Sequence, residues 1–177
     1  MSSWLAVAAD QITALATGIK ADVRRHHGME ADVQMNFMCF RDDTDYTDWF
    51  QTYNTGFTND IAGMSTFIRS MRATGGGDLP EDVTGAMKTA ASMPWSAQAR
   101  FFLLVSDAPC HGEKYQSLGA TRDNYPDGNE PSGLPEPILN QLKAKKVHFL
   151  FSRITSQTDI MIEKFRNTYD DRGFKNT

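Results

Sequence analysis

Two short apolar runs constrain the fold of this sequence more than any other feature: FFLLV at residues 101–105 and VHFLF at residues 147–151. A continuous apolar run of this length is typical of a strand that is buried on both faces of a parallel sheet. Apolar residues at helical spacing predict helices before, between and after these runs. Their apolar faces lie within residues 4–23, 61–71, 83–91, 138–142 and 160–169. Helices that alternate with buried strands predict an α/β fold, a doubly wound and mostly parallel sheet with helices on both faces.

Finer predictions concern the remaining strands and the places where two helices begin. The segment VQMNFMCF at residues 33–40 predicts a strand, and another short strand is expected around residues 49–53. Asn59 or Asp60 can cap the helix whose apolar face follows. Pro80 suits the first turn of the next helix, where a missing N–H group costs nothing.

Length and charge narrow the class of protein. The 177 residues fit one domain, residues 1–177, with a sizeable core. The formal net charge of -4 argues against binding to nucleic acid or to an anionic membrane. No apolar run approaches the ~20 residues of a membrane span, and charged residues interrupt residues 4–23, unlike a signal peptide. Cys39 and Cys110 are too few for a disulfide framework, so we expect reduced thiols in a cytoplasmic protein.

The segment TGGGDLPEDV at residues 74–83 joins three glycines to three carboxylates at a predicted helix start. A phosphate-binding loop would instead end in Gly-Lys-Ser/Thr, and carboxylates would repel a phosphate. Two explanations stay open. The helix dipole alone favours Glu81 and Asp82 at a helix N-terminus. Alternatively, the carboxylates are ligands for a hard cation, Mg²⁺ or Mn²⁺.

Asp107 is a second candidate ligand, because it follows the strand predicted at residues 101–105. Open α/β sheets bind ligands at the carboxyl ends of their strands. A turn or a cap would explain this aspartate equally well. Two acid-bearing loops at one sheet edge nevertheless favour a metal site. The loop at residues 108–135 is longer than the usual ~4–6 residues of a connection, which favours a recognition surface.

Three other motifs are better explained without a function. RDDTD at residues 41–45 lacks the spacing of a calcium-binding loop, so we expect a solvated acidic loop. Cys110 and His111 are neighbours in sequence, whereas a nucleophile and its base usually meet across the fold. His26 and His27 close a predicted helix, where positive charge is favourable.

Five stretches of the sequence form a recognisable combination: FMCFRDD (37–43), ATGGGDLPEDVTGAM (73–87), FFLLVSDAPCHG (101–112), DNYPDGNEPSGL (123–134) and FSRITSQTDIMIEKF (151–165). Together they resemble a von Willebrand factor A domain, in the version found beside alpha-type protein kinases. They cover most of the chain in the family's order, and the combination of GGGD-x-PED with SDAPCHG is specific.

The resemblance implies a doubly wound, Rossmann-like sheet with a metal-ion-dependent adhesion site at its upper edge. By position, Asp78 matches the ligand from the second metal-binding loop and Asp107 the ligand from the third. The metal, Mg²⁺ or Mn²⁺, would complete its coordination with an acidic group of a partner protein. Residues of the loops at the same edge would contact that partner: Gly76, Gly77, Glu81, His111 and Asp127.

The sequence also departs from the family. Met1 matches the end of the first metal-binding loop, so the central first strand and that loop have no counterpart, and neither has the last strand. The cation would keep only about two protein ligands, although Mg²⁺ demands near-octahedral geometry. We therefore expect weak metal binding, and a chain that is a fragment of a longer protein or is shortened at its start.

Three functions follow from this reading. The first is a non-catalytic module that binds another protein. The second is a targeting or regulatory region of a longer alpha-type serine/threonine protein kinase. The third is a hydrolase that uses Asp78, Asp107 and His111 around a metal, which lacks a third conventional ligand and an evident nucleophile.

Overall fold

The computed structural model describes residues 2–42, 52–54, 56–73, 77–119, 122–128, 132–169 and 174–176. Two compact units divide the chain. The first contains Met1–Met38 and Asn54–Thr74, and the second contains Cys39–Tyr53 and Gly75–Thr177. That residues 1–177 form a single domain stays a prediction. Within the described part, no helix is both long enough and apolar enough to cross a bilayer.

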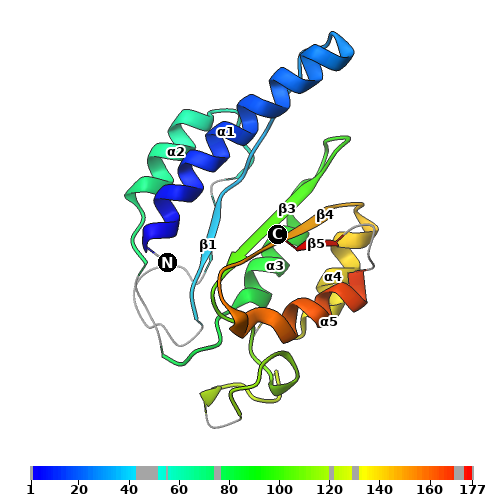
Figure 1. Ribbon diagram of the computed structural model, residues 1–177. Helices are drawn as coiled ribbons and strands as arrows, with labels where there is room; N and C mark the ends of the chain where they lie inside the picture. The colour runs from blue at the N-terminus through cyan, green and yellow to red at the C-terminus, as the bar shows by residue number, and fades with distance from the viewer. Residues whose placement is uncertain are drawn as a thin grey trace. The chain divides into compact units, whose positions relative to one another are not determined.

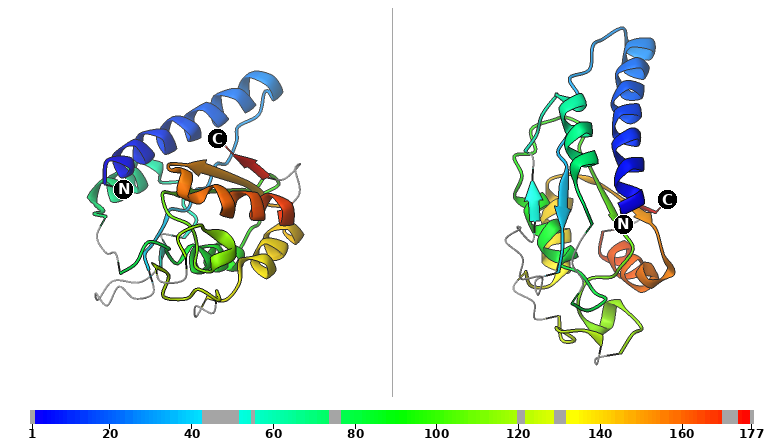
Figure 2. Two further views of the ribbon diagram at one scale, coloured as in Figure 1. Left: turned by 60° about the horizontal axis from the view of Figure 1, so that its bottom comes forward. Right: turned by 90° about the vertical axis from the view of Figure 1, so that its left-hand side faces the viewer.

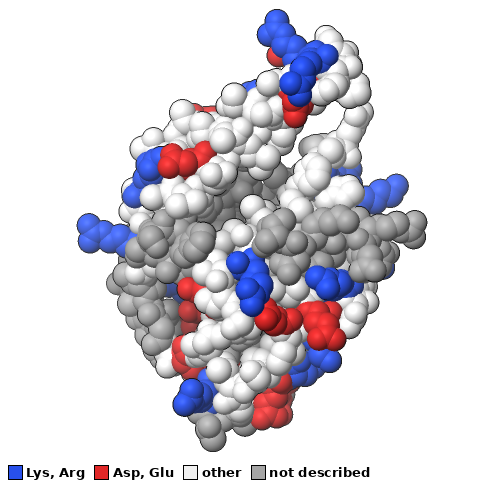
Figure 3. Space-filling model, in the orientation of Figure 1, with Lys and Arg blue, Asp and Glu red and all other residues white. Residues whose placement is uncertain are grey.

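The first unit is a pair of helices that lie side by side, α1 (Ser2–His27) and α2 (Ile61–Ser70) (Figure 1). Their contact is apolar because Ala9, Met64 and Ile68 are buried between them. Of the two predicted caps for α2, the structure uses Asp60, whose carboxylate accepts a hydrogen bond from Gly63 N at 2.9 Å. α1 ends in a basic turn, and Figure 3 shows Lys and Arg side chains gathered over that end.

The second unit is built on a small parallel sheet with the strand order β3-β4-β5. Its strands are β3 (Phe101–Ser106), β4 (His148–Arg153) and β5 (Phe174–Asn176). The sheet packs with α3 (Val83–Ser92), α4 (Pro135–Ala144) and α5 (Asp159–Tyr169), and Figure 2 shows α5 running along it. A separate two-stranded sheet pairs β1 (Met38–Phe40) with β2 (Thr52–Asn54). The chain is therefore a mixed α/β protein with a small parallel sheet, compatible with a Rossmann-like arrangement.

One face of this parallel sheet forms the main core. Phe149 and Phe151 of β4 are fully buried, and the Phe149 ring lies 6.1 Å from the ring of Phe165 on α5. Tyr169 closes the far end of α5 by donating its hydroxyl hydrogen to the carbonyl of Val147. The apolar positions that predicted these helices are the positions that face this core.

Three details of the sequence prediction were wrong. The run FFLLV is not buried on both faces: Phe101 and Leu103 are 55% and 49% exposed, while Leu104 is 3% exposed. The reason is that successive side chains of a strand point to opposite faces: Leu104 lies on the face that packs against the core, and Phe101 and Leu103 lie on the opposite, solvent-exposed face. The strand predicted at residues 33–40 is limited to β1 at its end. Pro80 precedes α3 instead of lying in its first turn, because Asp82 caps that helix.

Candidate functional site

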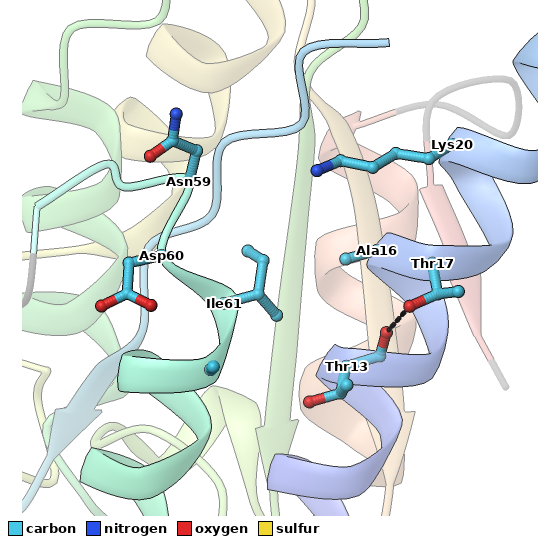
Figure 4. Close-up of a pocket in the computed structure, with 8 residues that line it drawn as sticks. Thr13, Ala16, Thr17, Lys20, Asn59, Asp60 and Ile61 are labelled. Atoms are coloured by element: carbon cyan, nitrogen blue, oxygen red, sulfur yellow. Dashed lines mark hydrogen bonds between the residues drawn. The ribbon is translucent and has the colours of Figure 1, made fainter. Parts of the chain in front are cut away.

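The first unit has a hollow of about 360 Å³ between α1 and α2 (Figure 4). Two of its polar side chains are engaged within the helices. The Asp60 carboxylate caps α2, and Thr17 Oγ1 donates to the carbonyl of Thr13 at 2.9 Å. The hollow is lined by Thr13, Ala16, Thr17, Lys20, Asn59, Asp60, Ile61 and Ala62. Because it gathers few titratable groups, we place the candidate site in the second unit.

Four titratable side chains meet in the second unit, and we call them the His111 cluster: Asp42, Asp78, His111 and Asp123. Nδ1 of His111 lies 2.7 Å from Oδ1 of Asp123, and Nε2 lies 2.9 Å from Oδ1 of Asp42. Oδ2 of Asp78 lies 4.0 Å from Nδ1. The side chains are 0% to 9% exposed, so the cluster is shielded from water.

The cluster is assembled by loops. Asp42 follows β1, Asp78 precedes α3, and His111 and Asp123 come from the long segment after β3, which Figure 1 shows beyond the sheet. A backbone bridge between Glu81 and Cys110, with Glu81 N 3.0 Å from the carbonyl of Pro109, joins two of these loops. That bridge brings Asp78 near His111.

Asp123 organises the long loop around His111. Besides His111, its carboxylate accepts hydrogen bonds from Gly112 N and Tyr125 N at 2.8 Å, and from Gln116 Nε2 at 3.1 Å. Gly112 has φ 108, a backbone conformation that side chains disfavour. The Tyr125 ring meets the His111 ring edge-on, with centroids 5.0 Å apart. The loop is therefore a folded element that presents His111 in one orientation.

Protonation follows from this geometry. Each ring nitrogen of His111 lies within hydrogen-bond distance of a carboxyl oxygen, and the tautomer and protonation state decide which nitrogen donates. Burial acts to raise the pKa of Asp123, but the hydrogen bonds from His111 and from the backbone outweigh it and hold that pKa below its ordinary value. The result is a buried His111 ring between two carboxyl groups, with Asp123 held in its ionised form.

Within the part of the chain that the structure describes, the buried carboxylate of Asp78 accepts fewer hydrogen bonds than that of Asp123. Its Oδ2 accepts a hydrogen bond from Asn124 N at 2.6 Å, whereas its Oδ1 is buried and has no hydrogen-bond partner among the described residues. Burial raises the pKa of Asp78 above its ordinary value, against the lowering effect of the Asn124 bond and of His111. A buried acceptor without a hydrogen bond lowers stability by about 1–3 kcal/mol, so Oδ1 of Asp78 is an unfavourable feature of the structure without a ligand.

The described residues form one group whose ligand atoms could hold a metal ion: Asp42, Asp78 and His111, within 4.8 Å of one another. Asp107, the other predicted ligand, does not belong to that group. Asp107 is half-buried, and its backbone carbonyl accepts a hydrogen bond from Thr155 Oγ1 at 2.6 Å. The donor set differs from the predicted set because it includes a nitrogen.

The predicted partner-binding residues differ in how far they are exposed to solvent. Gly77 and Asp127 are exposed, Glu81 is half-buried, and Gly76 lies outside the described residues. His111 is 1% exposed and its side chain lies in the cluster, and its part in partner binding stays a prediction. The buried position follows from its two carboxylate partners, which replace water around the ring.

Sequence reasoning missed two members of the cluster. Asp42 belongs to the segment predicted as a solvated loop, yet it is 0% exposed; the rest of RDDTD lies outside the described residues. Its place just after β1 was an available signal, the same signal that pointed to Asp107. Asp123 had no such signal, because its role depends on how residues 111–125 fold.

Comparisons with known proteins add one relationship. No family model matches the sequence. Over 137 residues the chain is 31% identical to the "Alpha-protein kinase vwkA" of Dictyostelium discoideum, an alignment that covers 76% of this chain and 21% of that protein. The chain therefore spans about a fifth of the length of this relative, and it is similar to a segment of a protein named as a kinase.

Proposed function

We propose that this chain is a non-catalytic protein-binding module of the von Willebrand factor A type, associated with an alpha-type kinase in a longer parent polypeptide. The observation that carries the proposal is the similarity over 137 residues to a segment of an alpha-protein kinase. The small parallel sheet is compatible with the A-domain fold. Its loops, including exposed Gly77 and Asp127, offer a surface for a partner.

The state of Cys110 supports a non-catalytic role. It is 0% exposed and belongs to the main core, and its backbone N–H group faces the sulfur of Met161 at 3.1 Å. A thiolate nucleophile needs an accessible, electropositive setting. His111 is engaged with carboxylates, so a nucleophile–base pair at residues 110–111 is disfavoured.

A hard cation remains part of this proposal. The buried Oδ1 of Asp78 suits Mg²⁺ or Mn²⁺, whereas Asp107 lies outside the ligand group of the described residues. Asp78 would hold the ion and direct it to an acidic group of the partner. Calorimetric titration of the purified chain with Mg²⁺ tests this, and weak binding that is lost in Asp78→Asn would support it.

The proposed module is tested on the native polypeptide. We expect an antibody against residues 1–177 to capture a protein larger than 19.8 kDa that transfers phosphate from ATP, whereas the purified chain transfers none. Phosphotransfer by the purified chain would contradict the non-catalytic role. Deletion of the segment from the parent should change location or partner binding and leave phosphorylation of a generic peptide intact; a slower rate on that peptide would favour a regulatory region instead.

The partner surface has its own test. Asp127→Arg, on the exposed loop, should change the affinity of a cross-linked partner complex at least tenfold, because reversal of a rim charge alters the rate of encounter. Glu163→Arg, exposed on α5, is the matched control and should leave the complex unchanged. Equal effects of the two variants would place the docking surface elsewhere.

A further inference from the structure

We propose that Asp42, Asp78 and His111 form a binding site for a divalent cation of the first transition series, with Zn²⁺ as the preferred occupant, and that Asp123 positions His111 for it. The three ligand atoms lie within 4.8 Å of one another. Zinc binds imidazole nitrogen and carboxylate oxygen at roughly 2.0–2.2 Å, so small movements of the three side chains would bring their ligand atoms to coordination distance. The site differs from the predicted oxygen site at Asp78 and Asp107.

The buried carboxylate of Asp78 supports this site. Its side chain is only 9% exposed, and Oδ1 has no hydrogen-bond partner among the described residues. The other oxygen is held by Asn124 N at 2.6 Å, which fixes the carboxylate in place next to His111. A buried carboxylate oxygen that is held in place without a partner is suited to coordinate a cation.

The orientation of the His111 ring also supports this site. Histidine ligands typically donate their other ring N–H to a carboxylate, which fixes the tautomer and the ring plane. Here Nδ1 faces Asp123 at 2.7 Å, and Asp123 is held in turn by Gly112 N and Tyr125 N at 2.8 Å. Nε2 lies 2.9 Å from Oδ1 of Asp42, so a cation bound between these two atoms would take the place of their present contact. Asp123 is thus a positioning residue.

Charge also supports this site. The cluster gathers three carboxyl groups and one imidazole, so a dication would offset negative charge that these side chains carry together. The nitrogen ligand favours zinc over Mg²⁺ and Ca²⁺, which prefer oxygen ligands alone.

The test is a Zn²⁺ titration of the purified 177-residue chain after chelator treatment, with Co²⁺ as a spectroscopic probe. We expect one Zn²⁺ per chain with a micromolar or lower Kd, visible absorption bands from bound Co²⁺, and no competition from millimolar Mg²⁺. His111→Gln and Asp42→Asn should each weaken binding at least 100-fold. Asp107→Asn and the exposed Asp159→Asn are controls that should bind as the unaltered chain does.

Asp78→Asn provides a second route if the other two variants fail to fold. An asparagine keeps an acceptor for Asn124 N but loses the anionic ligand, so Zn²⁺ binding should fall while the circular dichroism spectrum stays unchanged. Undiminished binding in a folded Asp78→Asn variant would overturn the proposal. So would weakened binding in Asp107→Asn, or Co²⁺ spectra identical with and without His111.

Discussion

Nδ1 of His111 lies 2.7 Å from Oδ1 of Asp123, and both side chains are fully buried. Removal of one member of a buried ion pair strands the other charge, which typically costs about 3–5 kcal/mol. We therefore expect Asp123→Ala to lower the free energy of unfolding by that amount in urea titrations. Asp127→Ala, exposed in the same loop, should change it by less than about 0.5 kcal/mol. Similar losses in both variants would mean that Asp123 does not organise the loop.

Two helix caps offer a matched pair of glycine substitutions. Alanine favours a helix over glycine by about 1 kcal/mol, but a Cβ on Gly85 would lie 2.1 Å from Oδ2 of the capping Asp82, which is 4% exposed. Gly85→Ala should therefore displace the cap and destabilise the protein by about 1–2 kcal/mol. In Gly63→Ala the exposed Asp60 can swing into water, so thermal unfolding should show little change. A stabilised Gly85→Ala variant would contradict this prediction.

Tyr169 makes stability sensitive to alkaline pH. Burial raises the pKa of Tyr169 to about 12, while a tyrosine in the unfolded chain titrates near pH 10. The folded state thus favours the protonated phenol, and its contribution is complete below about pH 10 and is lost as pH rises toward 12. Tyr169→Phe should lose about 1 kcal/mol at neutral pH, because the Val147 carbonyl loses its donor.

Urea titrations at several pH values check this prediction. The difference in unfolding free energy between the two proteins should narrow from pH 9 to pH 11. A constant difference over that range would show that the Tyr169 phenol titrates as an exposed group does.

Glu136 makes a smaller contribution at acid pH. Burial acts to raise the pKa of Glu136, but hydrogen bonds from Lys114 Nζ at 2.8 Å and from the Tyr115 hydroxyl at 2.7 Å outweigh it, so that the pKa is lowered. Its stabilisation is complete above the unfolded pKa of about 4.3 and is lost as pH falls through the lower folded value. Because the side chain is 34% exposed, we expect less than about 1 kcal/mol.

Glu136→Gln is the corresponding variant, since it keeps the shape of the side chain and removes the titration. Its unfolding free energy should depend less steeply on pH between pH 5 and 3. An unchanged slope would show that other carboxylates dominate acid unfolding.

The helices were predictable because the cause of each is local. Apolar spacing at Met64 and Ile68, or at Met161 and Phe165, is visible in sequence and matches the buried faces. The extent of burial in β3 was not predictable in the same way. An apolar run shows that a strand is suited to burial, whereas the exposure of Phe101 depends on which elements flank the sheet.

The candidate site was predicted only in part. The sequence pointed to Asp78 from the glycines and acids around it, and the structure places Asp78 in the His111 cluster. His111 was expected at a partner surface, and Asp42 was expected in water. The burial of both side chains was not predictable, because pairing of an acid with a histidine 69 positions away leaves no local pattern.

That separation between Asp42 and His111 has a kinetic consequence. Their contact closes a loop across 69 positions, and the ordering entropy of such a loop must be lost before the contact stabilises anything. The parallel pairing of β3 with β4, joined through α4, depends on shorter-range order. We expect the contact to form after the folding transition state, so that loss of Asp42 speeds unfolding and hardly slows folding. The His111 cluster would then form late in folding, and it would affect the unfolding rate of the second unit more than its folding rate.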